Sequence, residues 1–140
     1  MRKTNAQKVS NKSTQGYKSA LSGALFEQKV ATHFSQKGWT VHIRKQTTNG
    51  EIDVYGEKLD KILGTKEYLL VECKRQEHVS AKDVMHFMKK LTSFYQRLPT
   101  YMLSNKPPVE AWIAHTGSID EDAIEVAPRG FKPKIKFKQF

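Results

Sequence analysis

The sequence lacks several features that would assign it to a compartment or a cofactor class. It contains a single cysteine, Cys73, so it has no internal disulfide and no thiol cluster for zinc, as is typical of a reducing compartment. No apolar run approaches the roughly 20 residues that a membrane span requires, and the first thirty residues contain no apolar signal segment. We therefore expect a soluble, cytoplasmic protein with no membrane partner. In a cell it would be associated with the nucleoid, and if it is viral it would be located in the host cytoplasm.

Acidic residues are missing from both ends of the chain. Residues 1–18 and 129–140 each hold five Lys or Arg and no Asp or Glu, and these ten account for the net charge of +10. Such ends suit a polyanion, because each neutralised phosphate releases counterions. Solubility or a disordered tail is the alternative. The DNA-binding candidates at the two ends are Lys3, Lys8, Lys12, Lys18, Lys132, Lys134, Lys136 and Lys138.

The length of 140 residues corresponds to one domain. We expect a flexible basic arm, residues 1–18, and a single domain, residues 19–140, that ends in the basic segment 129–140. Periodicity predicts helices for residues 19–37, 80–98 and 119–127, and strands for residues 39–46, 51–57, 68–74, 109–115 and 131–138. Gly38 predicts the end of the first helix, Ser80 and Asp83 have the spacing of a capping box, and residues 58–66 are expected to form a polar loop. This order, α-β-β-β-α-β-α-β, predicts an α/β fold with a central mixed β-sheet flanked by helices.

Charged residues occupy two predicted strands at positions that a core would fill with apolar groups. Alternate side chains of a strand share a face. One face of the earlier strand would therefore carry Glu51, Asp53 and Tyr55, opposite Ile52 and Val54, and one face of the later strand would carry Leu70, Glu72 and Lys74, opposite Leu69, Val71 and Cys73. If the two strands pair, Asp53 and Glu72 converge beside Lys74, which predicts a divalent-metal site. Solvent-facing acids paired with lysines are the alternative.

Three further patterns surround this pair of strands. Glu27 lies within the apolar stripe of the first helix, so its carboxylate needs a partner unless it sits at the helix edge beside a lysine. Alternation places Arg44 opposite Val41 and Ile43 in the first strand, and helical spacing places Lys90 on the polar side of the second helix with His86, Lys82 and Lys89. Thr47 and Thr48 are typical of a turn and are also able to bind phosphate.

Three motifs together resemble the PD-(D/E)XK nuclease superfamily, which has the restriction-endonuclease-like fold. They are Gly23-x-x-Phe26-Glu27, Gly50-Glu51-Ile52-Asp53 and Glu72-Cys73-Lys74. These motifs are similar to those of archaeal Holliday junction resolvases and Mrr-type restriction endonucleases, and residues 79–87 and 122–127 also resemble the Mrr type. Ile52 occupies the position of the proline that gives the PD motif its first letter. This difference removes none of the chemical groups of the site.

The resemblance implies a restriction-endonuclease-like core and a Mg²⁺-dependent deoxyribonuclease that acts as a homodimer on double-stranded or branched DNA. It implies Asp53 and Glu72 as metal ligands, Lys74 as the catalytic lysine and Glu27 as an additional acid. Hard oxygen ligands suit Mg²⁺, with Mn²⁺ as a substitute, and the backbone carbonyl of Cys73 completes the expected set, while its thiol should pack in the core. Glu27 and Glu51 are further ligand candidates, and the remaining DNA-binding candidates are Arg44, Thr47, Thr48 and Arg75.

Several functions remain open at this point. Within the nuclease hypothesis, junction resolution competes with restriction or repair cleavage. A non-catalytic nucleic-acid-binding module with a nuclease-like fold is the alternative of a different class, and a small structural protein with solubilising tails is a third.

Overall fold

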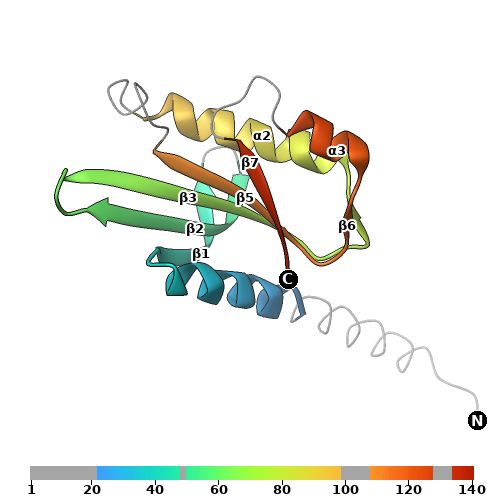
Figure 1. Ribbon diagram of the computed structural model, residues 1–140, viewed down its shortest axis with the longest axis horizontal. Helices are drawn as coiled ribbons and strands as arrows, with labels where there is room; N and C mark the ends of the chain where they lie inside the picture. The colour runs from blue at the N-terminus through green and yellow to red at the C-terminus, as the bar shows by residue number, and fades with distance from the viewer. Residues whose placement is uncertain (1–21, 48–49, 99–107, 128–133) are drawn as a thin grey trace, which may run out of the picture.

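The computed structural model describes residues 22–47, 50–98, 108–127 and 134–140. In these residues the chain forms a five-stranded sheet with helices on both faces and a two-stranded sheet at one end (Figure 1). The predicted α/β fold with a central mixed sheet is confirmed. The basic arm, residues 1–18, lies outside the described residues. No helix in the described part of the chain combines the length and apolar character that a bilayer crossing requires.

The elements follow the predicted order, with two short strands added. The described part of the N-terminal helix covers residues 22–36. The later elements are β1 (Thr40–Thr47), β2 (Gly50–Asp60), β3 (Thr65–Lys74), β4 (His78–Val79), α2 (Ala81–Gln96), β5 (Val109–His115), β6 (Ser118–Ile119), α3 (Glu121–Val126) and β7 (Ile135–Gln139).

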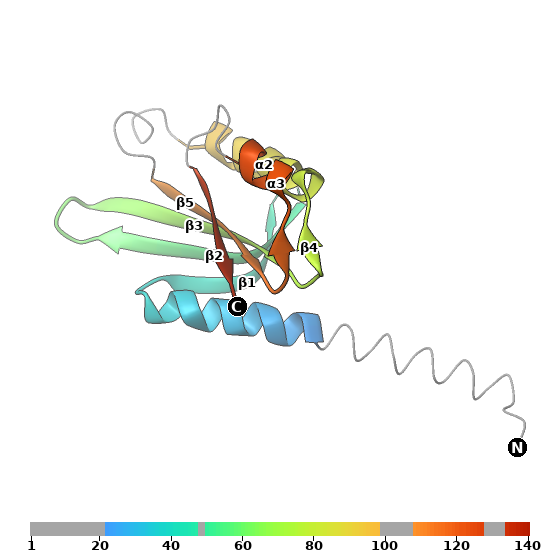
Figure 2. The ribbon, with the colours of Figure 1, turned by 45° about the vertical axis from the view of Figure 1, so that its right-hand side comes forward.

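The large sheet has the strand order β1-β2-β3-β5-β7. β1, β2 and β3 are antiparallel neighbours along the chain, whereas β3, β5 and β7 run parallel. Parallel neighbours need crossover connections, and here α2 lies in the connection between β3 and β5 while α3 lies in the connection between β5 and β7. Both helices therefore cover one face of the sheet, and the N-terminal helix covers the other (Figure 2).

Apolar side chains fill the space between the sheet and the helices on each face. On one face, Val30, Ala31 and Phe34 of the N-terminal helix pack with Val54, Leu69 and Val71 of the sheet. On the other, Val84, Phe87 and Leu91 of α2 pack with Ile52, Leu70 and Ile113. Burying apolar surface on both faces stabilises the sheet, because each buried large aliphatic side chain contributes about 1.5–3 kcal/mol.

The helix ends agree with the sequence signals. Gly38 has φ +96, and the amides of Trp39 and Gly38 donate to the carbonyls of Phe34 and Ser35, which is a Schellman motif. At α2, the Ser80 hydroxyl accepts from the Asp83 amide, and the Asp83 carboxylate accepts from the Ser80 amide. The predicted capping box is confirmed.

Two segments differ from the sequence prediction. Residues 58–66 were expected to form a loop, but β2 continues to Asp60 and β3 begins at Thr65. The Asp60 carboxylate accepts from the amides of Ile62 and Leu63, which closes a tight turn that Gly64 completes with φ +66. The third helix was expected to begin at Ile119 but begins at Glu121, because Ser118–Ile119 pairs with His78–Val79.

Candidate active site

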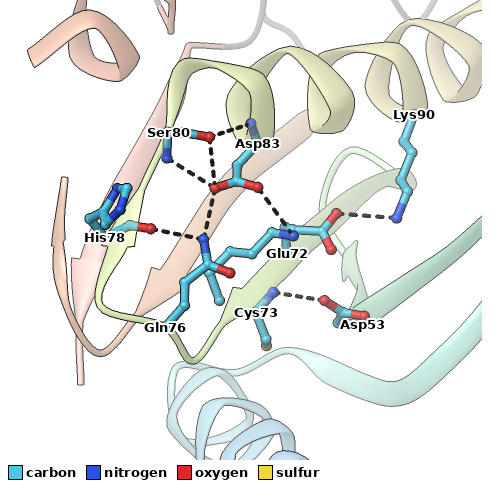
Figure 3. Close-up of polar contacts among 9 residues, drawn as sticks. Asp53, Glu72, Cys73, Gln76, His78, Ser80, Asp83 and Lys90 are labelled. Atoms are coloured by element: carbon cyan, nitrogen blue, oxygen red, sulfur yellow. Dashed lines mark hydrogen bonds and ion pairs between the residues drawn. The ribbon is translucent and has the colours of Figure 1, made fainter. Parts of the chain in front are cut away.

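Asp53 and Glu72 meet at the point where β2 and β3 separate. The last paired residues of these two strands are Val54 and Val71, so Asp53 and Glu72 follow directly beyond the end of the ladder. There the carboxylate of Asp53 accepts a hydrogen bond of 2.8 Å from the Cys73 backbone amide, which takes the place of a strand-to-strand bond (Figure 3). The predicted convergence of these two acids is confirmed.

The face assignment of β2 was wrong in part. Ile52 and Tyr55 pack in the core under α2, whereas Val54 packs under the N-terminal helix. The reason is a local irregularity between β1 and β2, whose register contains the pairs Ile43–Val54 and Lys45–Ile52 but no Arg44–Asp53 pair. Arg44 also has φ 58, a left-handed conformation that is uncommon for a residue with a side chain.

The same irregularity redirects Arg44. Its side chain was predicted to lie opposite Val41 and Ile43, but it reaches the N-terminal helix, where Nε lies 2.9 Å from Oε2 of Glu27. Only 14% of the Glu27 side chain is exposed, so this carboxylate needs a partner, and Arg44 is that partner. The pKa of Arg44 is raised by its hydrogen bond and charge interaction with Glu27, with smaller contributions from Glu51 and Asp53. Arg44 therefore links the N-terminal helix electrostatically to the acids of β2.

Burial and charge both act on Glu72. Glu72 is buried, with 8% of its surface exposed. The pKa of Glu72 is raised to about 7, mainly by burial and then by hydrogen bonding and charge from the neighbouring Asp53 carboxylate, while Lys90 and Lys74 oppose the rise. Two adjacent carboxylates of which one retains a proton near neutral pH form a site that a cation would stabilise.

Lys90 of α2 contacts this acid, a contact that the sequence interpretation missed. Its Nζ lies 3.2 Å from Oε2 of Glu72 and donates to the Glu51 carbonyl at 2.8 Å, and its side chain is 15% exposed. The assignment of Lys90 to the polar face was wrong, since the residue follows Phe87 by three positions and precedes Phe94 by four. That spacing was the available signal, because residues three and four apart share a helix face.

Lys74 and Glu72 both extend from β3 toward α2. Nζ of Lys74 lies 3.7 Å from Oδ1 of Asp83, the capping-box residue. The other oxygen of Asp83 accepts from Gln76 at 2.8 Å and from the Ser80 amide at 2.9 Å (Figure 3). Burial opposes ionisation of Asp83, but the hydrogen bonds from Ser80, the charge of Lys74 and the Gln76 bond together lower its pKa. A fixed carboxylate thus anchors the lysine, and neither this contact nor that of Gln76 was predicted.

The thiol of Cys73 packs against the core under the N-terminal helix, as expected. Burial raises its pKa well above the usual range, and the nearby carboxylates of Asp53, Glu27 and Glu72 raise it further. Cys73 is therefore a packed thiol and not an activated nucleophile.

The donor set suits a hard divalent cation that keeps part of its water shell. In the described segments no group of three or more His, Cys, Asp or Glu side chains is arranged to hold a metal. Asp53 and Glu72 supply two carboxylates, Glu51 is hydrogen-bonded to Gln46, and Glu27 is paired with Arg44. Mg²⁺ usually binds one or two carboxylates and completes its octahedron with water and phosphate oxygens. The raised pKa of Glu72 next to Asp53 is the observation that supports this fit.

The predicted DNA contacts are only partly described. Thr47 forms a turn, its hydroxyl donating to the Gly50 carbonyl. Arg75 is exposed directly after β3, Lys134 is exposed before β7, and the ammonium groups of Lys136 and Lys138 lie over the rings of Trp112 and Phe140. Those outside the described residues are Lys3, Lys8, Lys12, Lys18, Thr48 and Lys132.

The mixed sheet, with two acids and a lysine where β2 and β3 separate, defines the class of PD-(D/E)XK, restriction-endonuclease-like proteins. The chain belongs to the restriction endonuclease family of the Mrr type, whose model matches residues 19–137. That family model is described as a restriction endonuclease.

A solved structure supports the fold independently. The crystal structure of a repair endonuclease from Pyrococcus abyssi is similar to this chain with a TM-score of 0.52 and 18% sequence identity, over 73% of this chain and 38% of that one. The chain thus spans less than half the length of that endonuclease, and at this identity the likeness concerns the fold alone. No curated protein sequence matches the chain significantly.

Proposed function

We propose that the protein is a divalent-metal-dependent endonuclease that hydrolyses DNA phosphodiester bonds in an active site formed by Asp53 and Glu72. The observation that carries this proposal is the convergence of these two carboxylates, with the pKa of Glu72 raised mainly by burial and then by Asp53. Restriction-endonuclease-like proteins generally use divalent metals, and the hard oxygen donors favour Mg²⁺, with Mn²⁺ as a substitute.

Each group of the site has a role in this proposal. Asp53, Glu72 and the Cys73 carbonyl would hold the cation, which when bound supplies an activated water and stabilises the charge that develops on the phosphate. Lys74 orients the attacking water and stabilises the same developing charge with its ammonium group. The Asp83 carboxylate keeps this ammonium group near the α2 N-terminus.

Glu27 would act through Arg44 as well as directly. The ion pair of 2.9 Å between them fixes the charge of Arg44 beside the acids of β2. This arrangement supports Glu27 as the additional acid of the site and Arg44 as a contact for a phosphate of the substrate. Arg75 and the lysines near the two ends of the chain are proposed to bind more distant phosphates.

Cleavage assays test the proposal. The protein would be incubated with supercoiled, linear, single-stranded and four-way-junction DNA in Mg²⁺, Mn²⁺ or EDTA, beside Lys74→Ala and the control Lys66→Ala at the far end of the same strand. We expect metal-dependent cleavage by the native protein and the control, and none by Lys74→Ala. Junction-specific cleavage by a dimer would identify a resolvase. Salt-sensitive binding without cleavage in any metal would instead identify a non-catalytic binding module.

A further inference from the structure

A pocket of about 340 Å³ opens beside the active site, between β1, β2 and β3 on one side and the C-terminal half of α2 on the other. Small-molecule sites commonly have volumes of roughly 300–1,000 Å³. Two of its lining residues connect it to the carboxylates. Ile52 is the residue between Glu51 and Asp53, and Lys90 bonds to Glu72. A ligand in this pocket would therefore lie next to the proposed metal ligands.

Aromatic rings form much of the pocket wall. Phe94 meets Tyr68 edge to face with a centroid distance of 5.2 Å, and it meets Tyr55 at 6.2 Å. Tyr55 is fixed by burial and by the bond of its hydroxyl to Glu57, whereas Tyr68 and Phe94 are only half-buried. Half-buried rings held in place by their neighbours offer a flat apolar surface on which a planar ring can stack.

Cationic side chains stand beside these rings. Lys45 and Arg97 line the pocket and are both exposed, and the ammonium group of Lys45 lies 5.8 Å from the centroid of the Tyr55 ring. Among the charged lining residues, Glu57 is the acid, and it is already bonded to Tyr55 and paired with Lys66 at 3.3 Å. Aromatic surface with flanking cations is the chemistry that recognises a base together with its phosphate.

We propose that this pocket receives one unstacked base of the DNA strand whose phosphate lies at Asp53 and Glu72. The proposal rests on the proposed nuclease function of that site. The base would stack on the face of one of the two half-buried rings, Tyr68 or Phe94, and meet the edge of the other, and Lys45 and Arg97 would contact the phosphates beside it. Enzymes that turn a base out of the helix hold it by stacking between aromatic or apolar side chains, and an unpaired or mismatched base costs least to extract. The pocket would thus favour substrates with unpaired or easily opened positions.

A fluorescent base tests this proposal without requiring cleavage. A series of duplexes would each carry one 2-aminopurine, moved along the strand, and each would be titrated with protein in EDTA. Emission of 2-aminopurine rises when the base leaves the stack, so we expect a marked increase at one position of a bound duplex. Ser93→Phe introduces a ring into the pocket from α2 without removing any of the aromatic residues. We expect it to abolish the increase and to weaken binding roughly 5- to 150-fold, the range that stacking energies give.

The neighbouring Thr92→Phe is the matched control, because Thr92 is exposed and is not among the residues that line the pocket. It should bind DNA and increase emission like the native protein. An absence of emission change at every position of a bound duplex, or an equal change with Ser93→Phe, would overturn the pocket assignment and leave the nuclease proposal intact. A native protein that fails to bind DNA at low salt would instead contradict the proposed function itself.

Discussion

Replacing Glu72 by glutamine should make the protein more stable at alkaline pH while removing its activity. The pKa of Glu72 is raised to about 7, chiefly by burial and then by the Asp53 carboxylate. The folded state therefore binds more protons than the unfolded state between the ordinary pKa and about 7. The contribution of protonated Glu72 to the free energy of unfolding is fully present below the unfolded pKa and is lost as the pH rises through the folded pKa of about 7. Glutamine does not titrate, so Glu72→Gln removes this pH-dependent loss of stability.

The magnitude follows from the same values. One pKa unit corresponds to about 1.4 kcal/mol, so ionising Glu72 in the folded protein costs up to about 3 kcal/mol well above neutrality. Most of this cost arises between about pH 5 and pH 8. The difference in free energy of unfolding between Glu72→Gln and the native protein should therefore be about 2 kcal/mol larger at pH 8 than at pH 5. Lys90 keeps an acceptor in the glutamine carbonyl oxygen, which limits the loss of its contact.

Urea unfolding in EDTA at the two pH values measures this difference directly. The control is Glu121→Gln, an exposed glutamate in the first turn of α3, which should follow the native pH dependence. Adding Mg²⁺ at pH 8 should stabilise the native protein more than the variant, because a cation that binds the folded state adds its binding free energy. Equal pH dependence of the native protein and Glu72→Gln would refute the reasoning, since it would mean that Glu72 does not titrate in a buried carboxylate pair.

Four further substitutions have defined outcomes. Gly117→Ala should destabilise the fold by about 3 kcal/mol in urea unfolding, because its Cβ would overlap the backbone carbonyls of Gln76 and Glu77, whereas Gly38→Ala should cost only the left-handed strain of about 1 kcal/mol. Lys90→Met should raise the pKa of Glu72 further, because Lys90 now lowers it, and carboxyl NMR titration would measure this. Ser80→Ala should cost about 1 kcal/mol by removing the α2 cap, and an unchanged unfolding midpoint would contradict the capping role.

The parts of the fold that could be predicted were those with a periodic or local signal. The order of the main strands and helices followed from hydrophobic alternation and spacing, and the end of the first helix and the α2 capping box followed from Gly38, Ser80 and Asp83. The meeting of Asp53 with Glu72 was also predictable, because antiparallel pairing of two acidic strands leaves few alternatives. By contrast, β4 and β6 have two residues each, too few to show any period.

The site details that were missed depend on tertiary geometry. Nothing in the sequence signals that Arg44 adopts a positive φ, since no glycine marks that position, yet this conformation reverses the faces of the neighbouring residues. Lys90 was misplaced because a long polar side chain at the edge of an apolar stripe can face either water or a buried acid. Its partner, Glu72, lies in a different element, so only the packing of α2 on the sheet decides between the two.

Plasmid cleavage by Asp53→Asn, beside the control Asp122→Asn, tests the central claim most directly. Asp122 is exposed in the first turn of α3, so the same substitution there leaves the active site unchanged. In Mg²⁺ we expect the native protein and Asp122→Asn to cut supercoiled DNA, and Asp53→Asn to bind it with similar salt-dependent affinity but cut it more slowly by roughly 100-fold or more. Cleavage by folded Asp53→Asn at the native rate would contradict the assignment of the active site.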